Sequence, residues 1–200
     1  MKKGLLIIFS GPSGCGKGTV LKEILPDDSF YLSVSATTRP PRPTDIDGVD
    51  YRFLSKDDFQ QRIDSHAMLE YAEFCGNLYG TPADMVDQMR AEGKNVILEI
   101  EVEGALQVMK KCPDAISIFL LPPSLSELER RLRNRGTESE EVIRKRIQRA
   151  EEEIKLAYHY RYLIVNQTVD TAVEDFRAII RAESRTYHLN QEIIGEILSC

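Results

Sequence analysis

The chain has 200 residues, of which 42% are hydrophobic and 29% charged, and this length suits one sizeable hydrophobic core with small lobes attached. Its formal net charge of −6 argues against general affinity for nucleic acid, which requires a broadly basic face. The four cysteines include no C-x-x-C pair, so they indicate neither a metal cluster nor a disulfide framework, and reduced thiols favour a cytoplasmic protein.

The first predicted element is a buried strand at residues 5–9, followed by a glycine-rich loop and a helix at 20–25. The apolar run is too short for a signal peptide or a membrane span and meets Gly-Pro at once, so no membrane association is expected. The loop consists of Gly11, Pro12, Ser13, Gly14, Cys15, Gly16, Lys17, Gly18 and Thr19. Small residues let successive backbone N–H groups converge on phosphate oxygens, and the lysine adds a positive charge over the β- and γ-phosphates. The pattern predicts a nucleoside triphosphate site.

Gly18 and Cys15 are the two unusual residues of this loop. Gly18 stands where a serine or threonine that contacts Mg²⁺ is usual, and Thr19 follows one place later. Cys15 lies within the loop, where a small filler is favoured over a redox-sensitive thiol.

Further apolar runs alternate with helical patterns and predict a parallel sheet covered by helices. The runs are at 30–35, 95–100, 115–121 and 162–165, and the helices near 103–111, 124–134 and 169–186. The apolar face of the segment 192–198 suits either the chain's own core or a second copy, so the oligomeric state stays open.

Residues 36–89 interrupt the alternation of strands and helices. They begin with a proline- and arginine-rich stretch, continue through short aromatic-rich pieces, and contain helical patterns near 55–64 and 82–91. This composition predicts an inserted α+β lobe.

Residues 126–155 form a second departure, because they are densely charged and rich in arginine. An apolar stripe at helical spacing predicts one long helix and consists of Ile143, Ile147, Ala150 and Ile154. Gly136 and Thr137 permit a turn between two helical arms, and an arginine-rich helical flap suits a lid over the phosphate loop.

With these parts in order, the chain resembles the guanylate kinase family, whose members phosphorylate GMP with ATP. The resemblance covers nearly the full length and rests on six segments: G-P-S-G-x-G-K at 11–17, S-x-T-T-R-x-P-R at 35–42, G-x-D-Y-x-F at 48–53, G-N-x-Y-G-T at 76–81, I-L-E-I at 97–100 and R-L-x-x-R-G-T at 131–137. It implies a bacterial-type, single-domain α/β enzyme with a P-loop NTPase core, a five-stranded parallel sheet flanked by helices, a small α+β GMP-binding lobe and a helical lid. The implied parts of the single domain 1–200 are the core (1–34, 90–125 and 156–200), the lobe (35–89) and the lid (126–155).

The resemblance also implies a set of GMP-binding residues: Ser35, Arg39, Arg42, Tyr51, Glu70, Tyr79, Thr81, Glu99 and Glu101. The two arginines would clamp the GMP phosphate, because a planar guanidinium suits that task, and the two tyrosines would donate phenolic hydrogen bonds to it. Ser35 and Thr81 would supply hydroxyls to the base. Glu70 would read guanine by accepting from both its ring N–H and its exocyclic amine, a donor pair that adenine lacks.

Glu99 and Glu101 end the third core strand, where a doubly wound sheet binds its ligands. The family generally has aspartates in this segment. The longer side chains leave open which of the two holds Mg²⁺ through water and which faces the guanine nucleotide.

On the ATP side, the resemblance implies binding by residues 11–19 together with Arg131, Arg135 and Asn166, the last near the adenine. Arg131, Arg135 and Arg146 match lid arginines that close over the ATP phosphates. The implied catalytic set is Lys17, Arg39, Arg135 and Arg146, and Thr19 would contact Mg²⁺ largely through water and phosphates. Four further arginines are expected to be surface charges paired with glutamates such as Glu140 and Glu153: Arg130, Arg133, Arg144 and Arg149.

The expected function is therefore transfer of the γ-phosphoryl group of ATP to GMP, in purine nucleotide metabolism and GMP recycling, with Mg²⁺ as cofactor and ATP and GMP as partners. One alternative is a monophosphate kinase with another acceptor. A second is a non-catalytic, guanylate-kinase-like interaction module, although such modules typically have a damaged phosphate loop, whereas Lys17 and the lid arginines are present here.

Overall fold

The structure is a computed structural model that describes residues 2–134 and 139–199. Its centre is a five-stranded sheet with the order β2-β7-β1-β8-β9, in which every neighbouring pair is parallel. The strands are β1 (Leu6–Ser10), β2 (Phe30–Leu32), β7 (Asn95–Glu99), β8 (Ile116–Leu121) and β9 (Tyr162–Val165). The five apolar runs of the sequence therefore correctly predict the parallel sheet.

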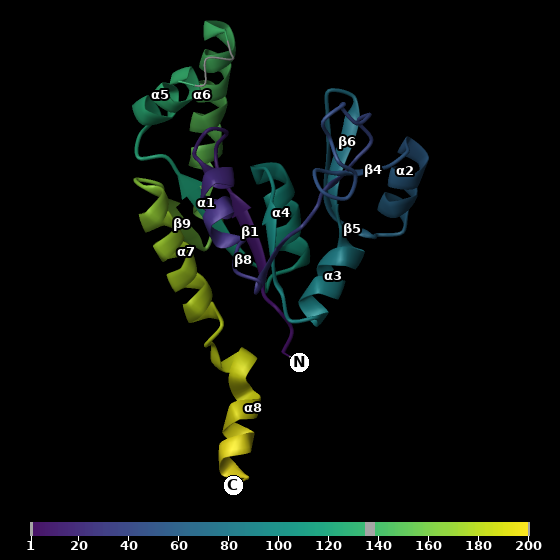
Figure 1. Cartoon of the computed structure of the whole chain (residues 1–200), viewed down its shortest axis with the longest axis vertical. Helices are drawn as coiled ribbons and strands as arrows, with labels where there is room; N and C mark the ends of the chain where they lie inside the picture. Colours follow the sequence, from purple (N-terminus) through teal and green to yellow (C-terminus); the bar gives the residue numbers. More distant parts are fainter. Residues whose placement is uncertain (1, 135–138, 200) are drawn as a thin grey trace.

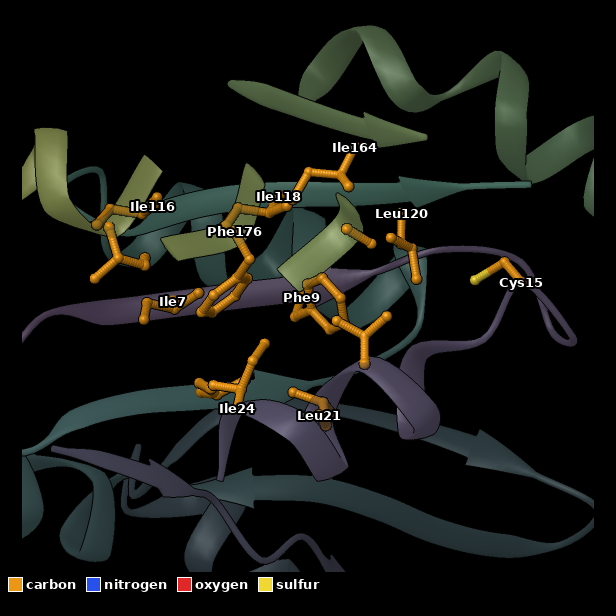
Figure 2. Close-up of a cluster of buried hydrophobic side chains, with 14 residues drawn as sticks. Ile7, Phe9, Cys15, Leu21, Ile24, Ile116, Ile118, Leu120, Ile164 and Phe176 are labelled. Carbon is orange, nitrogen blue, oxygen red and sulfur yellow. The ribbon is translucent and has the colours of Figure 1, made fainter. Parts of the chain in front are cut away.

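Helices cover both faces of this sheet, and alternate residues of β1 show the division. Ile7 and Phe9 pack with α1 (Lys17–Ile24) and α7 (Val169–Glu183). Leu6 and Ile8 pack with α3 (Ala83–Ala91) and α4 (Val102–Lys111) on the opposite face. Because β1 is buried on both sides, its sequence is a continuous apolar run rather than an alternating one. Figure 2 shows the first of these clusters, in which Phe176 of α7 lies beside Phe9.

A second sheet of four strands, in the order β4-β3-β6-β5, lies within the predicted lobe. Its strands are β3 (Ala36–Thr37), β4 (Arg52–Phe53), β5 (Met68–Phe74) and β6 (Asn77–Pro82), and α2 (Lys56–Asp64) packs Phe59 against it. β5 and β6 form an antiparallel hairpin whose turn contains Cys75 and Gly76, both at positive φ. Figure 1 shows this lobe to one side of the central sheet.

The predicted lid contains α5 (Leu125–Asn134) and α6 (Glu140–Lys155), which pack on each other through Leu128, Leu132, Ile143 and Ala150. The Ser139 hydroxyl caps α6 by accepting from the backbone N–H of Val142. The predicted turn residues Gly136 and Thr137 lie outside the described residues. In Figure 1 the two helices stand together at the same end of the molecule as the loop before α1.

The last elements are a short 3₁₀ turn, η1 (Ala157–His159), then α7, and finally α8 (Tyr187–Leu198). Figure 1 shows α8 extending away from the rest of the molecule, and none of its residues is buried. Of the two alternatives left open for this segment, the structure therefore does not favour packing into the chain's own core. In the described part of the chain, no helix combines the length and the apolar character needed to cross a bilayer.

Candidate active site

The glycine-rich loop connects β1 to α1 at the carboxyl end of the central sheet, where parallel α/β folds bind ligands. Gly16 precedes α1 with a φ of 103°, and a Cβ there would lie 2.4 Å from Nδ2 of Asn166. A side chain is therefore excluded both by the backbone conformation and by this contact. The Lys17 ammonium curls back over the loop and donates to the carbonyl oxygens of Gly11 at 2.6 Å and Pro12 at 3.4 Å.

Two elements distant in sequence meet this loop and brace it. The Asn166 amide, buried after the end of β9, donates to the Cys15 carbonyl at 2.7 Å. Arg131 of α5 donates to the same carbonyl at 3.2 Å and to the Asn166 carbonyl at 3.1 Å, while its Nε pairs with Glu127 at 2.8 Å. Together they line a cavity of about 330 Å³, here named the loop pocket, whose walls include Gly14, Gly16, Thr19, Arg131, Asn166, Gln167 and Thr168.

Cys15 itself points into the core beneath the loop (Figure 2). Its side chain is fully buried, and burial raises the pKa of the thiol, against the opposing charge of Lys17. A raised pKa disfavours the reactive thiolate. The packing supports the interpretation of Cys15 as a small filler.

Helix α6 reaches the loop from the predicted lid. Arg146 Nη1 donates to the Ser13 hydroxyl at 3.3 Å. Arg149 pairs with Glu153 within α6 at 2.9 Å, as expected, and also with Glu101 beyond the end of β7. The Glu101 contact was not predicted, because helical spacing indicates only partners on the same helix.

A second cavity of about 330 Å³, here named the lobe pocket, lies between the second sheet and the carboxyl end of β7. Six of the predicted GMP-binding residues line it: Ser35, Tyr51, Glu70, Tyr79, Glu99 and Glu101. Six further lining residues were not predicted as site residues: Ala72, Phe74, Gly80, Ile100, Glu103 and Gly104. The lining joins strands of the second sheet to the start of α4.

Glu70 lies on β5 with only 6% of its surface exposed, and its Oε1 accepts a hydrogen bond from the Thr81 hydroxyl at 2.6 Å. Burial raises the pKa of this carboxyl, and the Thr81 hydrogen bond and the charge of Lys111 oppose that rise. Thr81, predicted to contact the base, thus also orients the carboxylate.

Arg39 is not among the residues that line the lobe pocket, but its guanidinium lies 5.6 Å from the centroid of the ring of Tyr51, which does line it. It pairs with Asp45 at 2.8 Å, and Asp45 also accepts from the backbone N–H of Arg42 at 2.7 Å. These contacts hold the pKa of Asp45 below its usual range, the Arg42 N–H being the larger cause. The Tyr51 and Tyr79 rings meet edge to face, with centroids 5.9 Å apart. Asp45 was not predicted; its place in a turn three residues after Arg42 is the one available signal.

Glu99 lines the lobe pocket, and the charge of Lys17 in the phosphate loop acts on its carboxyl. Burial raises the pKa of Glu99, and Lys17 opposes that rise. Among the residues with described coordinates, no three His, Cys, Asp or Glu side chains gather as a metal site. Mg²⁺ does not need such a cage, since it commonly takes one or two protein oxygens with phosphates and waters.

The sequence model of the family described as guanylate kinase matches residues 3–183. The chain belongs to the guanylate kinase family. A guanylate kinase of Streptococcus agalactiae serotype III is 55% identical over 184 residues, which cover 91% of this chain and 88% of the relative. A guanylate kinase of Streptococcus pyogenes serotype M3 is 54% identical over 184 residues, covering 91% and 87%.

Comparison of folds agrees with this assignment. The crystal structure of guanylate kinase from Anaplasma phagocytophilum matches with a TM-score of 0.72 and 31% identity, covering 92% of this chain and 88% of that one. The predicted P-loop NTPase fold, with its five-stranded parallel sheet flanked by helices, is thereby confirmed.

For this guanylate kinase family member, the individual site residues and the bounds of core, lobe and lid remain predictions. Arg135, assigned to the ATP phosphates, lies outside the described residues. Arg130 pairs with Glu127, and Arg133 pairs with Glu129 and Glu140. These ion pairs confirm the surface pairing expected for both arginines.

Proposed function

We propose that ATP binds in the loop pocket and GMP in the lobe pocket, so that the γ-phosphoryl group of ATP passes to GMP and gives ADP and GDP. The chain is a nucleoside monophosphate kinase, and guanylate kinase relatives 55% identical to it support this reaction. The observation that carries the proposal is the buried Glu70 carboxylate in a pocket that Tyr51 and Tyr79 also line, with the Arg39 guanidinium 5.6 Å from the centroid of the Tyr51 ring. A purine base with a donor pair at one end and a phosphate at the other matches that arrangement.

The acceptor base is recognised by Glu70. With Thr81 donating to Oε1, the carboxylate keeps lone pairs on both oxygens for the ring N–H and the exocyclic amine of guanine. Adenine presents an acceptor at the corresponding ring nitrogen and would leave the buried carboxylate without the two hydrogen bonds that guanine donates, which costs free energy. Selectivity for GMP over AMP follows from that penalty.

The acceptor phosphate is bound by Arg39, Arg42, Tyr51 and Tyr79. Asp45 supports this role, because it fixes the Arg39 guanidinium and the Arg42 backbone before any ligand arrives. Side chains that are already ordered lose less conformational entropy on binding, so the clamp is pre-organised.

The donor phosphates are bound by the loop N–H groups, Lys17, Arg131 and Arg146. The transition state of phosphoryl transfer is loose and highly anionic, so positioning and charge neutralisation account for most of the catalysis. The acceptor phosphate is already ionised near neutral pH, so no strong general base is required. The Thr19 hydroxyl, with Glu99 or Glu101 through water, would hold Mg²⁺, whose charge would offset the negative charge on the donor phosphates.

Closure of the predicted lid and lobe would exclude water, which otherwise competes as the phosphoryl acceptor. The contacts of Arg146 with Ser13 and of Arg149 with Glu101 support a lid that docks on the loop and the strand end. We assign the enzyme to cytoplasmic purine nucleotide metabolism and GMP recycling.

The alternative of a non-catalytic interaction module is not favoured, because the lysine of the loop and two lid arginines all make hydrogen bonds to the phosphate loop. The alternative of another acceptor is tested by measuring ADP release from ATP with Mg²⁺ and GMP, AMP or dTMP. We expect kcat/KM for GMP to exceed that for AMP by about 10⁴-fold, the discrimination typical of a site built to hydrogen-bond its substrate. Equal turnover of GMP and AMP would contradict the proposal.

A further inference from the structure

Helix α4 packs against strand β5 along a seam of side-chain-to-backbone hydrogen bonds, and both elements contribute residues to the lobe pocket. The Gln107 side-chain amide pairs with the Tyr71 backbone as a neighbouring strand would. It donates to the Tyr71 carbonyl at 2.9 Å and accepts from the Tyr71 N–H at 3.2 Å. One turn further on, Lys111 donates to the Met68 carbonyl at 3.2 Å. These bonds fix the register of α4 on β5 on both sides of Glu70.

Gly104 occupies the same face of α4, three residues before Gln107, and is buried against Glu70. A Cβ on Gly104 would lie 2.6 Å from Oε2, 3.1 Å from Cδ and 3.3 Å from Cγ of Glu70. Since real Cβ atoms essentially never come within 3.0 Å of another heavy atom, a side chain at position 104 cannot coexist with the carboxylate where it stands.

The backbone does not explain the glycine. Gly104 is not among the glycines at positive φ, and it lies inside a regular helix, where alanine is the better helix former. The structure shows a different constraint on position 104: the Glu70 carboxylate occupies the space that a side chain there would need.

We propose that Gly104 is a positioning residue for guanine recognition: by lacking a side chain, it leaves the room in which the Glu70 carboxylate faces the lobe pocket. This inference rests on the proposed role of Glu70. Both residues line the pocket, and the Thr81 hydrogen bond fixes the other carboxyl oxygen, so any displacement of Oε2 rotates or withdraws the group that reads the base. The seam bonds prevent α4 from retreating, so the carboxylate has to move.

The decisive variant is Gly104→Ala, which moves Oε2 from 2.6 Å to ordinary contact at 3.4 Å or more from the new Cβ. We expect KM for GMP to rise about 100-fold, the cost of a misplacement approaching 1 Å, with KM for ATP unchanged. The preference for GMP over IMP, which lacks the exocyclic amine, should fall as well. Gly195→Ala is the matched control: it is the same change inside helix α8, with no atom within 4 Å of the new Cβ, and it should leave all three quantities unaltered.

A double-mutant comparison separates positioning from general damage. In a Glu70→Ala background, Gly104→Ala should cause no further rise in KM for GMP, because the side chain it displaces is gone. An equal rise in both backgrounds, or an unchanged KM in Gly104→Ala alone, would overturn the inference. If Glu70→Ala itself leaves the kinetics with GMP unchanged, the role of Glu70 in the proposed function fails instead.

Folding gives an independent readout should Gly104→Ala be insoluble. Glu70→Asp withdraws the carboxylate by one methylene, so the pair Glu70→Asp/Gly104→Ala should recover folded protein, measured by circular dichroism and the thermal midpoint. Failure to recover it would show that the added methyl acts on something other than Glu70, and would refute the inference.

Discussion

Arg131 allows a sharp test of how the lid helix α5 supports the phosphate loop, because its neighbour Arg130 is a matched control. Both arginines pair with Glu127, but only Arg131 also donates to the Cys15 and Asn166 carbonyls. Their side chains are 25% and 64% exposed, respectively. Alanine at either position keeps the helix and removes one partner of Glu127, so a comparison of the two isolates the loop contacts.

The expected magnitudes follow from those contacts. Arg131→Ala removes two hydrogen bonds from a charged donor at about 1 kcal/mol each once partial exposure is allowed for, so the unfolding free energy should fall by about 2 kcal/mol. For a chain of this size that corresponds to a decrease of roughly 4–8 °C in the thermal midpoint. Loss of a phosphate-binding cation should raise KM for ATP roughly 10- to 100-fold. KM for GMP should stay the same, because Arg131 does not line the lobe pocket.

The measurements are calorimetry or urea unfolding for stability, and initial rates of ADP release with one substrate varied and the other saturating. Arg130→Ala should be close to the parent protein in each, because exposed ion pairs contribute little. If both variants raise KM for ATP equally, or if Arg131→Ala raises KM for GMP as much as KM for ATP, the assignment of Arg131 to the donor phosphates is wrong.

Three further outcomes are expected. Lys17→Ala should lower kcat by at least about 10³-fold, because the transferred phosphoryl group loses a cation that stabilises its charge, while the circular dichroism spectrum stays that of the folded protein. Near-normal turnover would remove the loop from the mechanism. Glu70→Gln should stabilise the ligand-free protein increasingly as pH rises from about 4.5, since burial raises the pKa of Glu70 and folding then disfavours its ionised form. Urea unfolding of both proteins across a pH series measures this difference in stability. A difference that does not change with pH would contradict the prediction. Phe176→Ala should cost about 3–5 kcal/mol in urea unfolding, because its ring is fully buried and packs edge to face on Phe9; a loss under about 1 kcal/mol would mean that the core repacks freely.

The central sheet was predictable because burial on both faces makes its strands continuous apolar runs. The run at 115–121 coincides with β8 (Ile116–Leu121) to within one residue. The second sheet was harder to predict from the sequence, since β3 and β4 have two residues each and their pairing depends on partners elsewhere in the chain. Strands that short have no periodicity to detect.

The residues of the candidate site likewise include some that the sequence predicts and others that it does not. The phosphate loop was predicted because its chemistry needs a fixed local spacing of small residues and a lysine. Asp45 and Gly104 were not, because neither carries a motif of its own: Asp45 matters through Arg39, and Gly104 through a carboxylate on another element. Arg149 was predicted to pair only along its own helix, and its contact with Glu101 depends on how the lid lies over the strand end.

The position of β1 in the sheet has a consequence for how the chain is made. Both strands that flank β1 lie far downstream, since Leu6 pairs with Val96 and Ile7 with Ile116. At a synthesis rate of 5–20 residues per second, the ribosome needs roughly 5–20 s between making β1 and completing β8. Until β7 is made, the buried strand β1 has no partner strand on either edge, and until β8 is made one of its edges stays open, whereas the β5–β6 hairpin can close locally. Nascent chains of this protein are therefore most in need of a chaperone before β8 has left the ribosome.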